Sequence, residues 1–438
     1  MNLQDEADAQ CLFNRAGRLC GGCKEEYSPA IGSSHCIHCP NNNNLALLIF
    51  FAAAGFLLVF FISALNLTVT QGMINGLIFY ANIVWIYRVI LFPHQSEANA
   101  ALKFFEVFVA WLNLDFGIEL CLVIGLNAFW RTLLQYVFPF YVWGIAGVMI
   151  FSAKYSVTLT KLVGNRAVPI LATLFLLSYI KILRTIVASF LFTNIKVFNG
   201  IKNHTLTVWS LDGNHLYCHY PHVLLFIAAL AILVCLWLPY TLLLLLVQWL
   251  RRLSHFKVLR WITRFNPVYD AYLAPLKHKH HYWFGTLLLV RGILFIMFLA
   301  TSTVYPRVNM LLLQLIAGLL ICYMNYKRVF KKKYVQILEN LHLFLLILVG
   351  GTASIETSKK YVVVYISTAI AFLTLCGIIL WNLLSHFMTA KMFIRRTTIR
   401  GEMCSSQSRV QSITLKATGK TNQFRDSILD ENSPLTAD

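Results

Sequence analysis

Charged side chains are scarce in this sequence. Asp, Glu, Lys and Arg make up 13% of its 438 residues, whereas soluble domains contain about 25%. Hydrophobic residue types make up 58%, an excess that one water-soluble core cannot hide. The apolar residues also gather in runs of about 18 or more, the length that crosses a bilayer core. These features exclude an ordinary soluble domain and predict a polytopic membrane protein.

Catalytic motifs are missing as well. The sequence has no HExxH, no Walker lysine loop, and no carboxylate or Ser/His set at catalytic spacing. His278, His280 and His281 could ligate a metal, but they lie beside Lys277 and Lys279 without an acidic partner, so a solvated basic turn is the better interpretation. We therefore expect neither an enzyme nor a cofactor.

The hydrophobic runs predict an all-α bundle of about nine transmembrane helices. The second is the least regular, because Gln71, Asn75, Asn82 and Arg88 interrupt it, and such side chains usually face protein or a wet cavity. Without this helix, every later loop would change sides. The predicted spans are Leu45–Leu65, Thr68–Phe92, Leu133–Ala153, Val168–Phe192, Val223–Val247, Phe284–Val304, Met310–Tyr326, Val335–Ala353 and Tyr361–Leu384.

The distribution of basic residues predicts the orientation. The formal net charge is +19, and Lys and Arg are concentrated in alternate connecting segments: 154–166, 251–279, 327–333 and the tail after 385. The positive-inside rule then places the amino terminus outside and the carboxyl terminus inside, in the plasma membrane. We attribute the positive charge to orientation and to contact with anionic inner-leaflet lipids, and expect no binding of nucleic acid.

Cysteine placement agrees with an outer amino terminus. Five cysteines lie in the first 39 residues, and two lie in the longest predicted outer loops, where an oxidising compartment favours disulfides. Two C-x-x-C pairs also fit a zinc ribbon, an alternative that the outer location disfavours. Because five is odd, one partner must lie elsewhere, in an outer loop or an upstream domain. The disulfide candidates are Cys11, Cys20, Cys23, Cys36, Cys39, Cys121 and Cys218.

Two glycosylation sequons depend on the same orientation. Asn203 in NHT falls in a predicted outer loop and should accept a glycan, whereas Asn66 in NLT falls in a predicted inner turn and should not. The expected protein is therefore a glycoprotein.

Three regions are expected along the chain. Residues 1–44 form a small cysteine-rich extracellular stub, residues 45–384 a helical membrane bundle, and residues 385–438 a basic, largely disordered cytoplasmic tail. The polar start MNLQDEADAQ is not a cleavable signal peptide. Together with the odd cysteine, it favours a piece of a longer ectodomain protein over a complete chain.

Charged residues inside the predicted spans are candidate functional residues. Lys181 and Arg184 lie on one face of the fourth span, where charge requires a partner, water or snorkelling. They indicate an ion pathway or gating element, or else a structural ion pair. Arg291, near the start of the sixth span, is within snorkelling reach of the interface. The acidic candidates to pair with Lys181 and Arg184 are Asp115, Glu119, Glu339 and Glu356.

The stretch RFNPVYDAYLAPLKHKHHYWFG, residues 264–285, is polar between two apolar runs. It contains the NPxxY pattern of rhodopsin-like receptors, but there is no DRY-type motif and the span count is not seven. We interpret it as an amphipathic basic segment at the inner interface, against anionic lipid. Its charged candidates are Asp270, Lys277 and Lys279.

Several stretches resemble one family of membrane proteins: RLCGGCKEEYSPAIGSSHCIHC, NLTVTQGMINGLIFYANI, WLNLDFGIELC, LATLFLLSYIKILRT and DAYLAPLKHKHHYWFGTLLLVR. They are similar to large invertebrate and protist proteins with an EGF-like or ephrin-receptor-like cysteine module and a transient receptor potential-like membrane region. The resemblance covers most of the chain from Cys11 to about Leu384.

The resemblance implies a cation channel subunit, which a homo-oligomer would complete. The alternative is a non-channel surface receptor or adhesion anchor that links a cysteine-rich ectodomain to the membrane. A transporter would require an internal duplication, and none is evident in the sequence.

Overall fold

The structure is a computed structural model. It describes residues 11, 14–17, 20–29, 36–39, 45–91, 100–115, 126–156, 160, 163, 166–198, 203–246, 266–301, 306–353, 362–385 and 388. Among these residues, eight helices are long and apolar enough to cross a membrane. The protein is therefore a mostly helical, multi-pass membrane protein.

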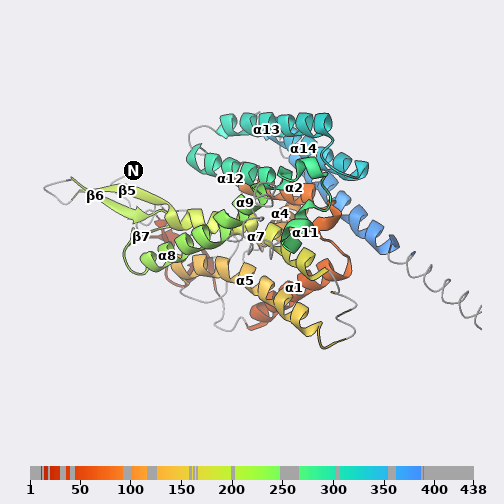
Figure 1. Cartoon of the computed structure of the whole chain (residues 1–438). Helices are drawn as coiled ribbons and strands as arrows, with labels where there is room; N and C mark the ends of the chain where they lie inside the picture. Colours follow the sequence, from red (N-terminus) through yellow and green to blue (C-terminus); the bar gives the residue numbers. More distant parts are fainter. Residues whose placement is uncertain are drawn as a thin grey trace, which may run out of the picture. The chain divides into compact units, whose positions relative to one another are not determined.

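The helices follow the chain from the amino-terminal module to the tail (Figure 1). The α-helices are α1 (Leu45–Ala64), α2 (Asn75–Ile86), α3 (Arg88–Leu91), α4 (Ala100–Leu112), α5 (Ala128–Ser152), α7 (Ala167–Phe190), α8 (His222–Ile232), α9 (Leu238–Leu245), α11 (Asn266–Leu273), α12 (Trp283–Thr301), α13 (Pro306–Lys327) and α14 (Lys333–Ala353). An unlabelled helix follows at Val362–Ser385. Short 3-10 helices lie at η2 (Val69–Gln71) and η6 (His278–His280), and a π-helical turn, η4 (Leu233–Trp237), joins α8 to α9.

Two helices form the centre of the bundle. Every residue of α2 is buried, and α2 packs against α4, α7, α12 and α14. In α7, 78% of the apolar stretch is buried, compared with 17% in the stretch His222–Leu245. Both central helices carry buried polar side chains, such as Asn82 of α2 and Lys181 of α7, as expected for polar groups that face protein and not lipid.

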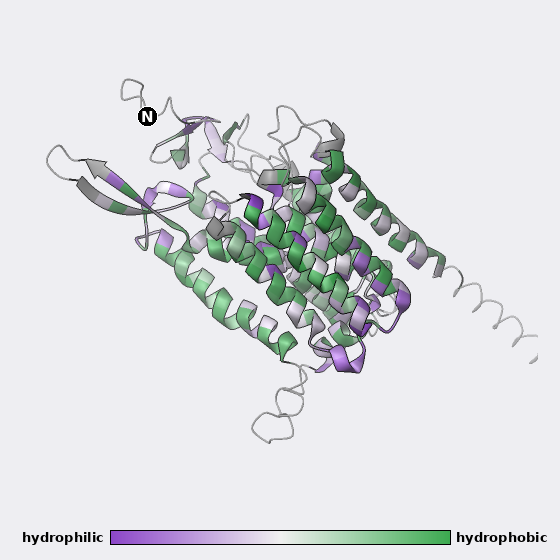
Figure 2. Cartoon of the chain, turned by 90° about the horizontal axis from the view of Figure 1, so that it is seen from above, coloured by the Kyte–Doolittle hydropathy of each residue, from purple (hydrophilic) through white to green (hydrophobic). Residues whose placement is uncertain are grey.

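The outer surfaces of the peripheral helices are hydrophobic (Figure 2). Large apolar side chains are exposed along α1, α5, α8 and α13; examples are Phe61, Val148, Ile227 and Leu319. Exposed hydrophobic surface on this scale marks contact with a membrane in a protein that is otherwise well packed. The apolar helices therefore indicate insertion into a lipid bilayer.

The predicted span Thr68–Phe92 is not one long helix. Gly72 adopts a left-handed φ of 75° after η2, so the helix restarts at Asn75 and α2 has only 12 residues. Asn75 and Asn82, the side chains that interrupted the hydrophobic run, are buried in protein at 2% and 0% exposure. Among the described residues, eight helices are long enough to cross a membrane, and the second of the nine predicted spans is a short buried helix instead.

The prediction of an all-α bundle is wrong for the segment after α7. Strands β5 (Phe192–Phe198), β6 (Asn203–Trp209) and β7 (Asp212–Leu216) form an antiparallel sheet in that order. The second half of β6, TLTVW, is rich in β-branched and aromatic residues, which favour strands. Trp209 anchors the sheet, because its side chain is fully buried and its Nε1–H donates to the carbonyl oxygen of Ala188 at 2.9 Å.

Four short strands build the cysteine-rich module. β1 (Arg15–Ala16) pairs with β2 (Gly22–Cys23), and β3 (Tyr27–Pro29) pairs with β4 (Cys36–His38), each pair antiparallel. With strands of two or three residues, the module lacks a hydrophobic core of its own, so its cross-links must hold it together.

The chain divides into two compact units, Met1–Ile378 and Ile379–Asp438. The boundary falls inside the helix Val362–Ser385, six residues before the tail predicted from 385 onward. The rest of that tail, apart from Met388, lies outside the described residues.

The backbones of α9 and α12 lie so close together at Gly285 that one added methyl group should lower stability. A Cβ added at Gly285 would lie 2.4 Å from the backbone of Leu245, whereas a Cβ at Gly147 would meet nothing within 4 Å. We expect Gly285→Ala to lower the thermal midpoint of the detergent-solubilised protein and Gly147→Ala to leave it unchanged or raise it, because Ala favours helix by about 1 kcal/mol over Gly. Size-exclusion of heated samples measures both, and equal midpoints would contradict the α9–α12 packing.

Candidate functional site

An ionic centre on α7 joins three elements of the bundle. Lys181 is 5% exposed, and its Nζ lies 3.7 Å from Oδ1 of Asp115. On the same face, Nη1 of Arg184 lies 3.5 Å from Oδ2 of Asp115. One carboxylate thus serves two cations, and the Lys181 ammonium also lies 5.5 Å from the Phe138 ring of α5. Such sharing reduces the cost of keeping two charges away from bulk water.

Asn113 and Leu114, which follow α4, fix the position of Asp115. The Asn113 side chain accepts from Nδ2 of Asn82 at 2.8 Å and donates to the carbonyl oxygen of Ala81 at 3.0 Å, both on α2. Leu114 then turns the chain with a φ of 53°. Its carbonyl oxygen accepts from Nζ of Lys181 at 2.5 Å. The turn at Leu114 therefore gives the Lys181 ammonium an additional hydrogen-bond acceptor.

Of the four acidic partners considered from the sequence, Asp115 is the one that the structure brings to Lys181 and Arg184. Glu339 belongs to a different site, at the start of α2. Glu119 and Glu356 lie outside the described residues. The acidic partner that two cations in one span require is thus Asp115, the last residue of WLNLD. Asn113 and Leu114 of the same segment are buried.

Glu339 of α14 caps the buried start of α2. The capping residue of α2, Ile74, offers no side-chain acceptor. The Glu339 carboxylate instead accepts a hydrogen bond from the backbone N–H of Gly76, and it approaches so closely that a Cβ on Gly76 would lie 2.7 Å from Oε2. Because the first N–H groups of a helix have no internal partner and carry partial positive charge, a carboxylate there is stabilising.

Arg291 of α12 lies near the same end of α2. Its side chain is 1% exposed and its Cζ lies 4.9 Å above the Phe79 ring. Glu339 is the charged group that attracts it most strongly. Its Nε and Nη1 have no hydrogen-bond partner among the described residues. The expectation that Arg291 snorkels to the interface is therefore wrong: the guanidinium points into the protein, toward an aromatic face and an acid.

Tyrosine hydroxyls continue this polar interior toward α11. Tyr240 donates to the hydroxyl of Tyr272 at 2.6 Å, and Tyr272 donates to the carbonyl oxygen of Ala172 at 2.5 Å. Tyr179 donates to the carbonyl oxygen of Leu288 at 3.2 Å. Sequence analysis of residues 264–285 missed this role for Tyr272. The signal was present in the spacing, because Tyr269 and Tyr272 are three residues apart and both are buried.

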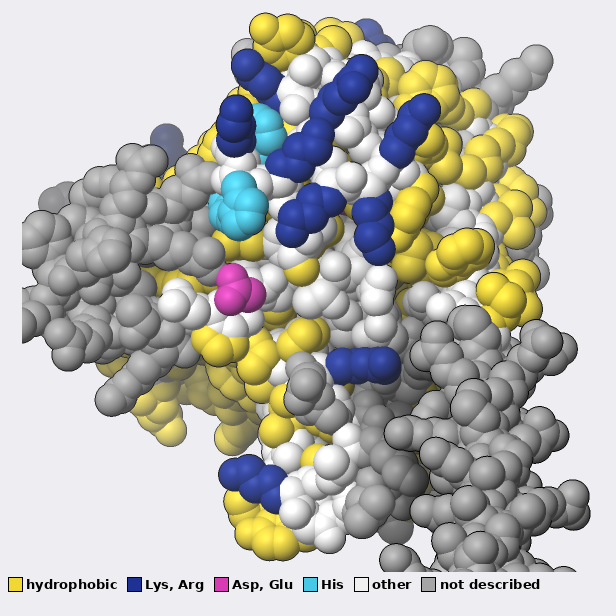
Figure 3. Space-filling model, turned by 45° about the vertical axis from the view of Figure 1, so that its right-hand side comes forward, with side chains coloured by type: hydrophobic (Ala, Val, Ile, Leu, Met, Phe, Trp, Pro, Cys, Tyr) yellow, Lys and Arg dark blue, Asp and Glu magenta, His cyan; other side chains and the backbone are white. Residues whose placement is uncertain are grey.

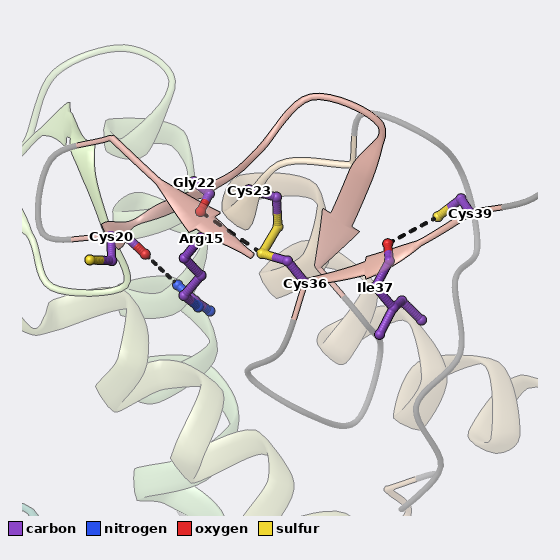
Figure 4. Close-up of a disulfide and its surroundings, with 7 residues drawn as sticks. All are labelled: Arg15, Cys20, Gly22, Cys23, Cys36, Ile37 and Cys39. Atoms are coloured by element: carbon purple, nitrogen blue, oxygen red, sulfur yellow. Dashed lines mark hydrogen bonds between the residues drawn. A yellow bond between two sulfur atoms is a disulfide. The ribbon is translucent and has the colours of Figure 1, made fainter. Parts of the chain in front are cut away.

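Disulfides cross-link the amino-terminal module, as predicted. Cys11 pairs with Cys20 and Cys23 pairs with Cys36, and Cys39 is disulfide-bonded too. Arg15 donates through Nη1 to the carbonyl oxygen of Cys20 at 2.7 Å, inside the loop that the first disulfide closes (Figure 4). Cysteines of both C-x-x-C pairs are thus oxidised, and their thiolates cannot form the zinc ribbon considered as an alternative.

The prediction that Cys218 forms a disulfide is wrong. It is a free, exposed thiol in the turn before α8, where its backbone N–H donates to Nδ1 of His222 at 3.1 Å. The long predicted outer loop that contains it folds into the sheet β5–β7. The residues of β7 that approach the module are Asp212, Gly213 and Asn214, not Cys218. Cys121, the other outer-loop candidate, lies outside the described residues.

The module is packed on β7. A Cβ added at Gly21 would lie 2.5 Å from the backbone nitrogen of Gly213 and 2.9 Å from Cα of Asp212. Burial lowers the pKa of Arg15, and the nearby Asp212 carboxylate opposes this shift. A guanidinium stays protonated at physiological pH, so the module and β7 also attract each other as opposite charges.

Basic side chains gather on one face of the molecule (Figure 3). In the segment 264–285, Lys277, Lys279 and Asp270 are exposed. The backbone of Lys277 donates to Val329 at 3.0 Å, which joins this segment to the turn between α13 and α14. That turn contributes further exposed cations: Lys327, Arg328, Lys331, Lys332 and Lys333.

The two sequons lie in different settings. Asn203 begins β6, opposite Phe198, at the far end of the β5–β6 hairpin. Asn66 has a left-handed φ of 51° in the turn after α1, and its Oδ1 accepts from Oγ1 of Thr68 at 3.4 Å. Thr68, whose hydroxyl the sequon requires, is fully buried. The structure therefore gives a local reason, besides orientation, for Asn66 to remain unmodified.

Comparison with known proteins finds no match: no family model, no curated protein and no solved structure is similar to the chain. Among the described residues, no group of three or more His, Cys, Asp and Glu side chains could hold a metal ion. Function is therefore argued from the geometry of these sites.

Because Glu339 caps α2, we expect its carboxylate to contribute more to stability than the volume of its side chain does. Glu339→Leu removes the acceptor for Gly76 and the charge that faces Arg291, so we expect a loss of about 3 kcal/mol of stability. Glu339→Gln keeps an acceptor and should lose less. Thermal unfolding of both variants in detergent measures the difference. A Leu variant as stable as the Gln variant would rule out the capping role.

Proposed function

We propose that the chain is a receptor-type protein of the plasma membrane, with its cysteine-rich module outside the cell. The observation that carries this proposal is the packing of the module on β7. The sheet that contains β7 continues directly from α7, the helix that bears Lys181 and Arg184. A displacement of the module would therefore act on the buried ionic centre through a short, rigid connection.

The contact between the module and β7 also supports a count of nine crossings. Of the long helices, α1, α5 and α7 lie between the module and β7 along the chain. An odd number of crossings would put the module and β7 on opposite faces of the membrane, yet they touch. We infer that the segment with α2 and α3 provides the additional crossing, which would make nine together with the eight long helices of the described residues.

This short segment runs beside α7 over about half of a bilayer core, which is about 30 Å thick. At its start, the backbone N–H of Val69 donates to Oγ1 of Thr173 at 3.0 Å. At its end, the Trp85 ring lies 5.9 Å from Cζ of Arg184. Between Thr173 and Arg184, α7 rises by about 16 Å, and α2 follows it over that length. Protein on all sides replaces the hydrocarbon that a longer helix would face.

The basic face of Figure 3 supports the orientation. Its exposed cations lie in connections that, in a nine-span arrangement, are on the side opposite the module. The positive-inside rule assigns such connections to the cytoplasm, where anionic lipids attract them. The module is then extracellular, in the compartment that sustains its disulfides. The resemblance to surface proteins with an EGF-like module fits this arrangement.

Glycosylation tests the orientation. When the chain is expressed in mammalian cells, we expect a glycan on Asn203 and none on Asn66, because oligosaccharyltransferase acts only on the outer side. Removal of N-glycans should increase the electrophoretic mobility of the wild type and leave the mobility of Asn203→Gln unchanged.

The matched control is Asn66→Gln, which should behave as the wild type. Loss of the mobility shift in Asn66→Gln, with the shift retained in Asn203→Gln, would reverse the assignment of every loop and contradict an extracellular module.

A second candidate function is a cation channel subunit, as the transient receptor potential-like resemblance implies. The observation in its favour is the buried group of Lys181, Asp115 and Arg184 inside candidate spans, because ionisable residues within a membrane often belong to ion pathways or gating elements. In this proposal a homo-oligomer would complete the pore on its axis.

Whole-cell recording separates the two candidates. A channel predicts currents under stretch, voltage or lipid addition that Lys181→Ala and Arg184→Ala alter, with Arg307→Ala on the exposed start of α13 as the control. The receptor predicts no current above that of untransfected cells, although labelling confirms the protein at the surface. A current sensitive to Lys181→Ala would make the channel the better proposal.

A further inference from the structure

A cavity of about 560 Å³ lies between the cysteine-rich module and the bundle. Ligand sites in proteins occupy about 300 to 1,000 Å³, so the space suits a small organic molecule. The module contributes Gly21, Gly22 and Tyr27 to its lining. The other walls come from α2, α3, α5, α7, β7 and α12.

Arginines dominate the charge of this cavity. Arg15, Arg88, Arg131 and Arg184 line it, and each comes from a different element: β1, α3, α5 and α7. Asp212 is the one acidic residue among the lining residues. Its Oδ1 accepts from the backbone of Asn214 at 3.0 Å, and its Oδ2 lies 3.6 Å from His215. The lining therefore has a large excess of positive charge.

The arginines are close enough to repel one another. Arg184 acts electrostatically on both Arg88 and Arg131, and Arg15 acts on Arg131. Asp115 and Glu106 offset part of this repulsion at Arg88, and Asp115 does so at Arg131, but Asp115 already faces Lys181 and Arg184. A bound anion would neutralise several guanidinium groups together, and guanidinium forks match phosphate and carboxylate oxygens in pairs.

Aromatic rings supply the apolar part of the cavity. Trp85, Phe295 and Phe298 line it beside the arginines. The Arg88 guanidinium lies 4.1 Å above the Trp85 ring, which holds its charged end at the cavity. A cavity lined by both cations and aromatic rings is complementary to a molecule with an anionic group and an apolar body.

We propose that this cavity binds an organic anion that carries a phosphate or carboxylate group and an apolar body. The arginines hold the anionic group, and Phe295 and Phe298 contact the apolar body. Such an anion can come from the outer leaflet, as a lysophospholipid, or from solution, as a soluble organic phosphate. The inference goes beyond the proposed function, because binding to the purified protein does not depend on which side of the membrane the module occupies.

The test uses the purified full chain in detergent with three probes: oleoyl lysophosphatidic acid, oleoyl lysophosphatidylcholine and glycerol 3-phosphate. The first two share an acyl chain and differ in net charge, and the third is the anionic group without the chain. Thermal stabilisation and titration measure binding. We expect lysophosphatidic acid to bind tighter than lysophosphatidylcholine, and added salt to weaken its binding, because salt screens charge.

Arg88→Gln and Arg131→Gln should each weaken binding of the anion by about tenfold or more, the effect of one charge-assisted hydrogen bond. Arg307→Gln is the matched control, because Arg307 is exposed at the start of α13 and does not line the cavity. Elution position and unfolding midpoint without probe show that each variant is folded, and the salt dependence of the wild type does not rely on any variant.

The outcomes separate the sources of the ligand. Binding of glycerol 3-phosphate as tight as that of lysophosphatidic acid would indicate a soluble anion and overturn the contact with an apolar body. A requirement for the acyl chain supports a lipid. The proposal is overturned if no probe binds, if the two lysolipids bind equally, or if both variants keep wild-type affinity. None of these results bears on the glycan at Asn203, so failure here is distinct from failure of the proposed orientation.

Discussion

Burying charge beside hydrocarbon is the constraint on which this structure depends. Lys181 and Arg184 lie on one face of α7, and a cation at that depth costs several kcal/mol unless a partner offsets the cost. Asp115 is that partner, and it reaches α7 because Asn113 is fixed to α2. The ionic centre therefore determines where α4 ends and which face α2 presents to it.

Helix α2 is enclosed by protein on all sides. The backbone N–H groups at its start therefore need hydrogen-bond acceptors other than water. At the start of α2, Glu339 accepts from Gly76, and the absence of a Cβ at Gly76 lets the carboxylate approach. The same carboxylate attracts Arg291, whose Nε and Nη1 have no other partner among the described residues. Breaking either side of this arrangement leaves an uncompensated charge, so α2, α12 and α14 are fixed as one group.

Sequence reasoning succeeded where one residue type decided the outcome and failed where partners came from distant segments. The long helices follow from runs of apolar residues, although α5 begins at Ala128, five residues before the predicted start, because Asn127 accepts from the backbone of Trp130. Asp115 could be named because two cations in one span require an acid. Arg291 was misplaced, because its position near a helix start says nothing of Glu339 or Phe79. Tyr272 was missed for the same reason, since its acceptor is a carbonyl on α7.

Arg88 and Arg131, which line the cavity beside the module, bear most directly on function. If the module is extracellular, both arginines lie on the side where orientation signals disfavour positive charge. Asp115 explains why Lys181 and Arg184 are tolerated there. Asp115 and Glu106 act on Arg88 and Asp115 on Arg131 only at longer range, because neither arginine forms an ion pair within the described residues. Trp85 accounts for the position of the Arg88 side chain and not for its charge. An anion between α3, α5 and α7 would give both cations a counter-charge and would place the ligand in contact with the module and with the ionic centre of α7.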